Sequence, residues 1–132
     1  MSASGSPAAF APGSHQIVAH GGGAFALAGM RREGSILATP GGVRGIEATA
    51  AHELNPQTLA PMFEELATAP GSIEFVVIGT GAEMAAISRP LQAALRGAGL
   101  RFEAMATGPA LRVYNVMQAE GRRVAAALIA AP

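Results

Sequence analysis

The clearest strand pattern in the chain is Ile73-Glu74-Phe75-Val76-Val77-Ile78, and it stops at Gly79-Thr80-Gly81. The run is almost continuous in apolar residues and rich in β-branched ones. A strand of this kind is usually central in its sheet and covered on both faces. We therefore start from a buried strand at 73–78 and place the rest of the chain around it.

The segments that follow this strand alternate between helical and extended patterns. A helix is predicted from about 89 to 98, with Leu91, Ala94 and Leu95 facing inward. A strand is predicted over 101–105, a second helix over about 109–120 and a last strand over 124–129. This alternation is typical of helices packed on a mostly parallel or mixed sheet.

The first half of the chain has the pattern of an antiparallel meander. Strands are predicted from about 24 to 30, over 35–39 and over 43–46, with the polar segment 31–34 as the hairpin turn. A helix then opens at Asn55-Pro56, with Asn as N-cap and Pro at the first helical position. Alternatively, the regular helix begins at Thr58, so that Pro61 stands in the first turn. Its apolar face follows a helical spacing at Leu59, Met62, Phe63 and Leu66.

The N-terminal segment differs in composition from the rest. Residues 1–23 are rich in Ser, Ala, Pro and Gly and contain no acidic group. Few of these side chains could form contacts that offset the entropy lost on ordering, so a largely flexible arm is expected over 1–23, to which Ile17 and Val18 add a short edge strand. Residues 24–132 are expected to form a single α/β domain.

Several residue types are missing, and their absence excludes many kinds of chemistry. The 132-residue chain has 9 Arg and 9 Glu but no Lys, Asp, Cys or Trp. Disulfides, thiolate nucleophiles, Schiff bases and Cys-based metal sites are therefore excluded. The three His lack the spacing of a metal site, and no cofactor is expected. A neutral chain does not suit nucleic acid, and no apolar run is long enough to span a membrane, so the expected compartment is the cytoplasm.

Polar residues near the ends of two strands form the candidate ligand or partner site. Its members are Gly79, Thr80, Gly81, Thr107, Gly108, Arg112 and Asn115. If the two strands are parallel neighbours, both loops lie at one sheet edge, where ligands of open α/β sheets bind. The other interpretation is structural: the Gly-Thr-Gly loop is a tight strand end, and Arg112 hydrogen-bonds loop carbonyls.

The sequence contains no catalytic constellation. The Gly-x-Gly at 79–81 lacks the third glycine of the dinucleotide fingerprint, because Met84 stands in its place. Ser35 and Ser72 each follow a glycine but do not sit in a nucleophile-elbow motif. We expect no catalytic residues and no enzyme activity.

Four segments together form a recognisable pattern: 75–81 (FVVIGTG), 89–91 (RPL), 107–115 (TGPALRVYN) and 120–128 (EGRRVAAAL). The chain resembles the family of mitochondrial respiratory complex I assembly factor 3 and its small, mostly uncharacterised bacterial and archaeal relatives. The likeness covers roughly residues 25–129. It departs from the common pattern at Val113, where a hydroxyl residue often precedes the Tyr-Asn pair.

The resemblance implies a three-layer α/β fold with a central mixed sheet of about five strands, one antiparallel to the rest, plus a β-hairpin. Residues 34–37 (GSIL) and 40–43 (PGGV) fit the family's N-terminal meander. The mitochondrial members are non-enzymatic assembly factors that bind partner proteins at the membrane. No catalytic residues of the family carry over to this chain.

Two functions are therefore expected for this sequence. The first is a non-enzymatic protein-interaction or assembly factor for a membrane respiratory complex, with protein partners. The alternative is a small anion- or nucleotide-binding domain that uses the Gly-Thr-Gly loop and Arg112. A homodimer is a further expectation, because the sequence has many Met residues and a hairpin with an exposed edge.

Overall fold

A computed structural model of the chain describes residues 9–131. Its main element is a six-stranded sheet in the order β1-β6-β5-β9-β7-β8. The parallel strands β7, β8 and β9 lie together, and β5 is antiparallel to both of its neighbours, β9 and β6. The predicted mixed sheet of about five strands with one reversed strand is confirmed, and β1 adds a sixth strand. The bounds are β1 Ala11–Pro12, β5 Ile36–Thr39, β6 Gly42–Gly45, β7 Phe75–Gly79, β8 Arg101–Met105 and β9 Val124–Leu128.

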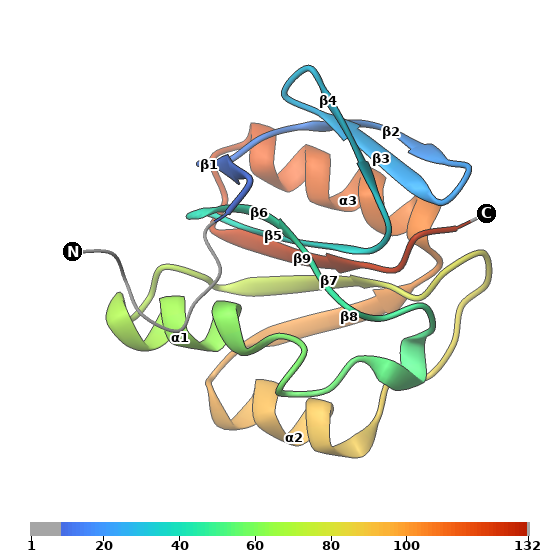
Figure 1. Cartoon of the computed structure of the whole chain (residues 1–132). Helices are drawn as coiled ribbons and strands as arrows, with labels where there is room; N and C mark the ends of the chain where they lie inside the picture. Colours follow the sequence, from blue (N-terminus) through green and yellow to red (C-terminus); the bar gives the residue numbers. More distant parts are fainter. Residues whose placement is uncertain (1–8, 132) are drawn as a thin grey trace.

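Helices cover both faces of this sheet. Helix α2 (Arg89–Gly97) connects β7 to β8, and α3 (Thr107–Ala119) connects β8 back past β7 to β9. Because the two connections run in opposite directions along the sheet, right-handed crossovers place the helices on opposite faces. Helix α1 (Ala60–Thr68) lies on the α2 side, so the three layers expected from the sequence are present (Figure 1).

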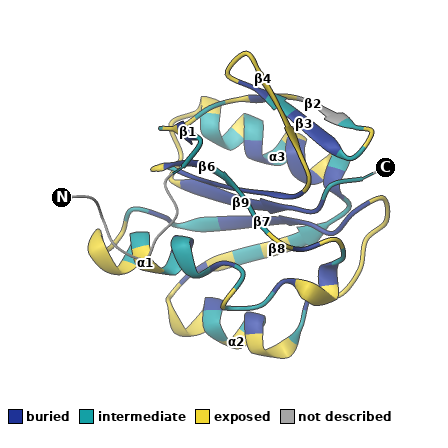
Figure 2. Ribbon diagram, in the orientation of Figure 1, coloured by how far each residue is buried: buried dark blue, intermediate teal, exposed yellow. Residues whose placement is uncertain are grey.

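The two faces of the large sheet bury separate apolar clusters. The cluster under α1 and α2 includes Leu59, Met62 and Leu91, and the cluster under α3 includes Phe25 and Tyr114. Strand β9 contributes to both clusters, three of its side chains are alanines, and all five of its residues are buried (Figure 2). Its alanines leave room for larger neighbours on both sides, so the Ala-rich composition supports a thin, central strand.

A second, three-stranded sheet lies on the α3 side of the large sheet (Figure 1). It consists of β2 (Ile17–Gly21), β3 (Ala24–Leu27) and β4 (Met30–Glu33), all antiparallel. The predicted hairpin turn at 31–34 is wrong, because the chain reverses at Ala28-Gly29, whose φ angles are +50° and +75°. Two positive φ angles are typical of the tight turn that suits twisted strands. The charged segment that resembled a turn is instead the exposed strand β4.

The N-terminal segment is more ordered than the sequence suggested. Of the arm expected over 1–23, residues 1–8 lie outside the described residues, but residues 9–23 contain β1 and β2. Ile17 is only 1% exposed and belongs to the cluster under α3. The short edge strand expected at Ile17 and Val18 is present as the start of β2, and pairing with β3 and β6 supplies contacts that the composition of this segment did not indicate.

The helix starts differ from the predictions by a few residues. Helix α1 begins at Ala60 rather than at Asn55 or Thr58, and Asn55 Oδ1 accepts a hydrogen bond from Thr58 N (2.8 Å) in a separate turn before it. Pro61 stands in the first turn of α1, where its missing N–H is tolerated. Helix α3 begins at Thr107, two residues early, and α2 has Ser88 as an N-cap that accepts from Leu91 N.

The β3–β4 turn offers a direct test of this hairpin. Ala28 is exposed and holds a left-handed conformation that costs an L-residue roughly 1–2 kcal/mol. We expect Ala28→Asn, which creates the favoured Asn-Gly turn pair, to raise the free energy of unfolding by about 0.5–1 kcal/mol in urea titrations. Gly29→Ala is the matched control and should lower it by about 1 kcal/mol. Equal stability of all three chains would contradict this turn geometry.

Candidate functional site

The ends of β7 and β8 are joined by the side chain and backbone of Thr107. Its hydroxyl accepts a hydrogen bond from Gly81 N (2.9 Å) and donates to Ile129 O (2.7 Å). Its own N–H donates to Gly81 O (2.8 Å), and Thr80 N donates to Met105 O (2.8 Å). Thr107 is fully buried. The fold therefore brings Thr80, Gly81 and Thr107 to one sheet edge, but their polar groups form hydrogen bonds within the protein.

The hydroxyl of Thr80 is also engaged within the loop. Its oxygen lies 2.7 Å from Glu83 O and 3.1 Å from Met105 O, and it accepts from Ala85 N (3.0 Å). The N–H groups of Thr80, Gly81 and Ala85 therefore all donate inside the protein. An anion held by the first two would have to displace these bonds. The anion- or nucleotide-binding site at this loop stays a prediction.

The other two glycines of the candidate site, Gly79 and Gly108, lie within the fold where α3 meets the strand ends. A Cβ on Gly79 would lie 2.9 Å from Thr107 Oγ1 and 3.0 Å from Leu128 Cδ2, so close packing requires glycine there. Gly108 is half-buried in the first turn of α3. The absence of a Cβ at Gly79 allows α3 to begin directly against the strand ends.

Asn115 binds the N-terminal strand rather than the Gly-Thr-Gly loop. Its Oδ1 accepts from Ile17 N (2.9 Å), and its Nδ2 donates to Ile17 O (2.8 Å). The side-chain amide therefore pairs with the outer edge of β2 as a neighbouring strand would. Next to it, the hydroxyl of Tyr114 donates to His15 O (3.3 Å). The Tyr-Asn pair thus holds residues 15–17 against α3.

Arg112 lies apart from these contacts, on the exposed side of α3. Among the residues that the structure describes, it has no hydrogen-bond or ion-pair partner. It borders a shallow depression of about 260 Å³, lined also by Val113, Val116 and Met117. Val116 is 58% exposed. The predicted polar cluster of Thr107, Arg112 and Asn115 is thus divided, and Arg112 is the member that faces solvent.

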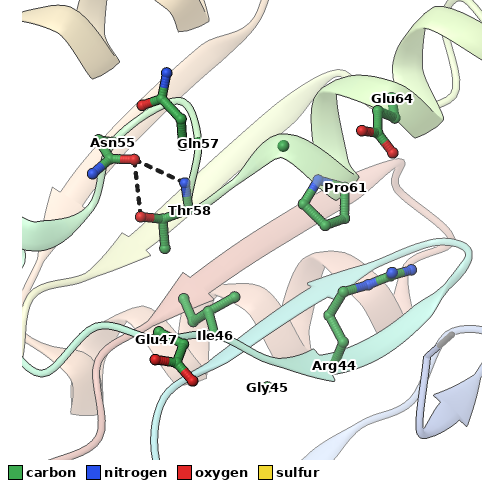
Figure 3. A pocket seen from close by; sticks show the side chains of 10 residues that line it. Arg44, Gly45, Ile46, Glu47, Asn55, Gln57, Thr58, Pro61 and Glu64 are labelled. Atoms are coloured by element: carbon green, nitrogen blue, oxygen red, sulfur yellow. Dashed lines mark hydrogen bonds between the residues drawn. The ribbon is translucent and has the colours of Figure 1, made fainter. Parts of the chain in front are cut away.

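A larger pocket than the one on α3 lies between the end of β6 and the turn that leads into α1 (Figure 3). Its volume is about 470 Å³, and charged, amide and apolar side chains share its wall. Thr58 Oγ1, the hydroxyl in this wall, is bonded to Asn55 Oδ1 (3.0 Å) and Glu53 O (3.1 Å). The lining residues are Arg44, Gly45, Ile46, Glu47, Asn55, Gln57, Thr58, Ala60, Pro61 and Glu64.

No pattern in the sequence indicates this pocket. Its residues come from two segments, 44–47 and 55–64, and their proximity depends on how the α1 layer folds onto β6. The one available signal was Asn55-Pro56, which was interpreted as a helix start and is instead a turn. Among the described residues, no group of three or more His, Cys, Asp or Glu side chains could hold a metal ion.

Comparison with known proteins places this arrangement in a family. Residues 17–129 match the family described as "Protein of unknown function (DUF498/DUF598)". The chain belongs to this family. The matched segment of this DUF498/DUF598 protein starts at Ile17, which Asn115 holds, and ends at Ile129, which accepts a hydrogen bond from Thr107. The family region therefore includes β2, which was expected to lie in the arm.

Bacterial proteins are among the relatives. An uncharacterized protein of Rhodobacter capsulatus is 35% identical over 120 residues, covering 91% of this chain and 88% of the relative. A Bartonella henselae crystal structure, described as an outer membrane protein, shares 35% identity with a TM-score of 0.84 and covers 92% and 99% of the two chains. A Rhodopseudomonas palustris NMR structure shares 40% identity with a TM-score of 0.74, at 92% and 89% coverage. Within residues 9–131 of the DUF498/DUF598 protein, no helix has the length and apolarity needed to cross a membrane.

The role of Thr107 is testable by removing its hydroxyl at constant shape. We expect Thr107→Val to lower the free energy of unfolding by about 2–4 kcal/mol, because Gly81 N and Ile129 O are both left without a partner in a buried site. Thr107→Ser keeps the hydroxyl and should cost only about 1 kcal/mol, the value of a buried methyl group. Urea unfolding measures both. A Val variant as stable as the Ser variant would contradict this role.

Burial of Tyr114 predicts a loss of stability in alkali. Desolvation raises the pKa of Tyr114 to about 12, while the unfolded chain ionises it near pH 10. A raised pKa means that the folded state holds the proton more tightly. Stability is therefore complete below pH 10 and falls by roughly 2–3 kcal/mol as the pH rises towards 12.

The titration of Tyr114 is simple to follow, because the chain has one Tyr and no Trp. Ultraviolet absorbance of the phenolate should show a midpoint near pH 12 in the folded protein, or coincide with unfolding seen by circular dichroism. A midpoint near pH 10 with the fold intact would show that the side chain is open to solvent.

Proposed function

We propose that this protein is a non-catalytic protein-binding domain and that its docking surface is the exposed side of α3. We call this surface the α3 face; it consists of Arg112, Val113, Val116 and Met117. The observation that carries the proposal is an apolar depression with a solvent-facing Arg at its border. Arg and large apolar side chains are enriched at protein interfaces.

The shape of the α3 face favours a protein over a small molecule. Small-molecule sites are concave pockets of roughly 300–1,000 Å³ with several convergent polar groups. The depression on α3 is smaller, about 260 Å³, and Arg112 supplies its one charged group. A flat, mostly apolar helix surface is better matched by another folded protein or a helix.

The state of the loop hydroxyls supports a role without catalysis. Thr80 and Thr107 stand at the sheet edge where α/β enzymes place reactive groups. Both hydroxyls bind backbone carbonyl oxygens, and a nucleophile would instead need a neighbouring base to accept its proton. Their positions favour a rigid framework that presents α3.

The finer proposal is that the partner belongs to a membrane respiratory complex that this protein helps to assemble. Its support is the resemblance of residues 25–129 to mitochondrial complex I assembly factors. The Bartonella henselae relative is described as an outer membrane protein, which adds a second link to membranes. In this function the α3 face would dock a subunit while the subunit is being assembled.

Site-specific crosslinking in the native cells tests this function. We expect a photoreactive amino acid at position 116 to capture respiratory or membrane-insertion subunits, and the same group at Met84 to capture none of them. Met84 is the matched control because it is 66% exposed but lies in the loop after β7. Arg112→Ala should reduce the captured product several-fold, while stability stays within about 0.5 kcal/mol. Equal product from positions 116 and 84 would contradict the proposal.

A further inference from the structure

The exposed side of α3 has a cation near one end and a carboxylate near the other, so two copies of it placed antiparallel would match opposite charges. Arg112 and Glu120 stand four residues before and four residues after Val116. In an α-helix, four residues advance about 6 Å and return to nearly the same side. The surface therefore presents a cation, an apolar centre and a carboxylate in line, about 12 Å from end to end.

Both charges are available to a partner. Among the described residues, neither Arg112 nor Glu120 forms an ion pair or a side-chain hydrogen bond, and both are exposed. Glu120 is the C-cap residue of α3. A carboxylate at this end of a helix is disfavoured by the helix dipole, so its own helix does not explain its position. A cation from outside would offset that cost.

The two exposed residues between these charges, Val116 and Ala119, are apolar, while the polar Asn115 and Gln118 are partly buried. Val116 is 58% exposed, Ala119 is exposed, and Val113 and Met117 are partly buried beside them. The opposite side of α3 carries Ala110, Leu111 and Tyr114, which are buried under the two sheets. The helix thus has one side for its own core and a second apolar side without a partner in the described chain.

We infer that the α3 face, extended by Ala119 and Glu120 at the C-terminal end of the helix, pairs with the same surface of a second copy of this chain, in antiparallel orientation about a two-fold axis at Val116. This inference rests on the proposal that the α3 face docks protein, and it names a second copy as the occupant of that face when no other subunit is bound there. The two-fold axis brings Arg112 against the partner's Glu120, and the pair occurs twice. Val116 meets the partner's Val116 at the centre. Such an interface uses the same patch on both copies, as two-fold dimers do.

The size of the surface sets the strength of the dimer. Helix α3 has 13 residues and is about 20 Å long. A single helix face of that length covers less than the roughly 800 Å² per partner of a standard stable interface. We therefore expect a reversible dimer that forms at micromolar or higher protein concentrations. Sedimentation velocity over a concentration series of the full chain measures it.

Charge reversal on one side of the pair tests the geometry. In the Arg112→Glu chain both positions are acidic, and in the Glu120→Arg chain both are basic. Like charges then face each other twice in each homodimer, so each variant alone should associate at least about tenfold more weakly than the original chain. When the two variants are mixed, every acidic side chain faces a basic one, and association should return to the original level.

The controls separate surface pairing from folding. Both charged positions are exposed, so circular dichroism and thermal unfolding of each variant should match the original chain. Met84→Arg adds a charge at an exposed residue away from α3 and should leave association unchanged. Restoration of binding in the mixture requires folded variants, so it cannot come from a folding defect.

Three outcomes would overturn the inference: a chain that stays monomeric up to about millimolar concentration, a dimer indifferent to both reversals, or a mixture that fails to associate. A monomeric chain whose position 116 still captures respiratory subunits in cells would overturn self-pairing and leave the proposed function standing. If position 116 captures only a second copy and the mixture associates, self-pairing holds and the assembly role falls.

Discussion

The hydrogen bonds of the Thr107 hydroxyl are the interaction on which the arrangement of the parallel strands β7, β8 and β9 depends. One oxygen atom joins the loop after β7, the start of α3 and the residue that follows β9. Gly79 allows this close approach, since a Cβ there would lie 2.9 Å from the same oxygen. Because buried backbone groups must be paired, the three segments keep a fixed relation at this edge. The edge where many α/β proteins bind ligands is here a structural joint.

The strands and helices from β7 to β9 could be predicted from the sequence because the residue patterns that indicate them are local. The apolar run before Gly79, the helical spacing of Leu91 and Leu95, and the glycines at helix ends each act over a few residues. In the N-terminal half, the prediction of the hairpin turn at 31–34 was wrong because the residue types did not indicate where the chain reverses. Ala28 adopts a left-handed conformation that alanine seldom takes, so the Ala28-Gly29 turn gave no turn signal and the charged segment after it was chosen instead.

The candidate site shows a second limit of sequence reasoning. Spacing placed Arg112 and Asn115 on one helix, but it could not reveal what each side chain meets. The partner of Asn115 is Ile17, 98 residues away, in a segment expected to be flexible. A pair so distant in sequence leaves no periodic pattern. For the same reason the pocket beside Arg44 and Glu64 was not foreseen, because its two walls meet only in the folded chain.

The distribution of polar groups separates structure from surface in this protein. Thr80, Thr107 and Asn115 satisfy backbone groups between layers, so these side chains stabilise the framework. Arg112 makes no such contact and lies beside the exposed Val116 and the partly buried Val113 and Met117. Helix α3 therefore carries both roles: its inner side is fixed by β2 and the large sheet, and its outer side is held rigid without being covered. A rigid, preformed apolar surface loses little conformational entropy on binding, which favours a docking role for α3 over the loops.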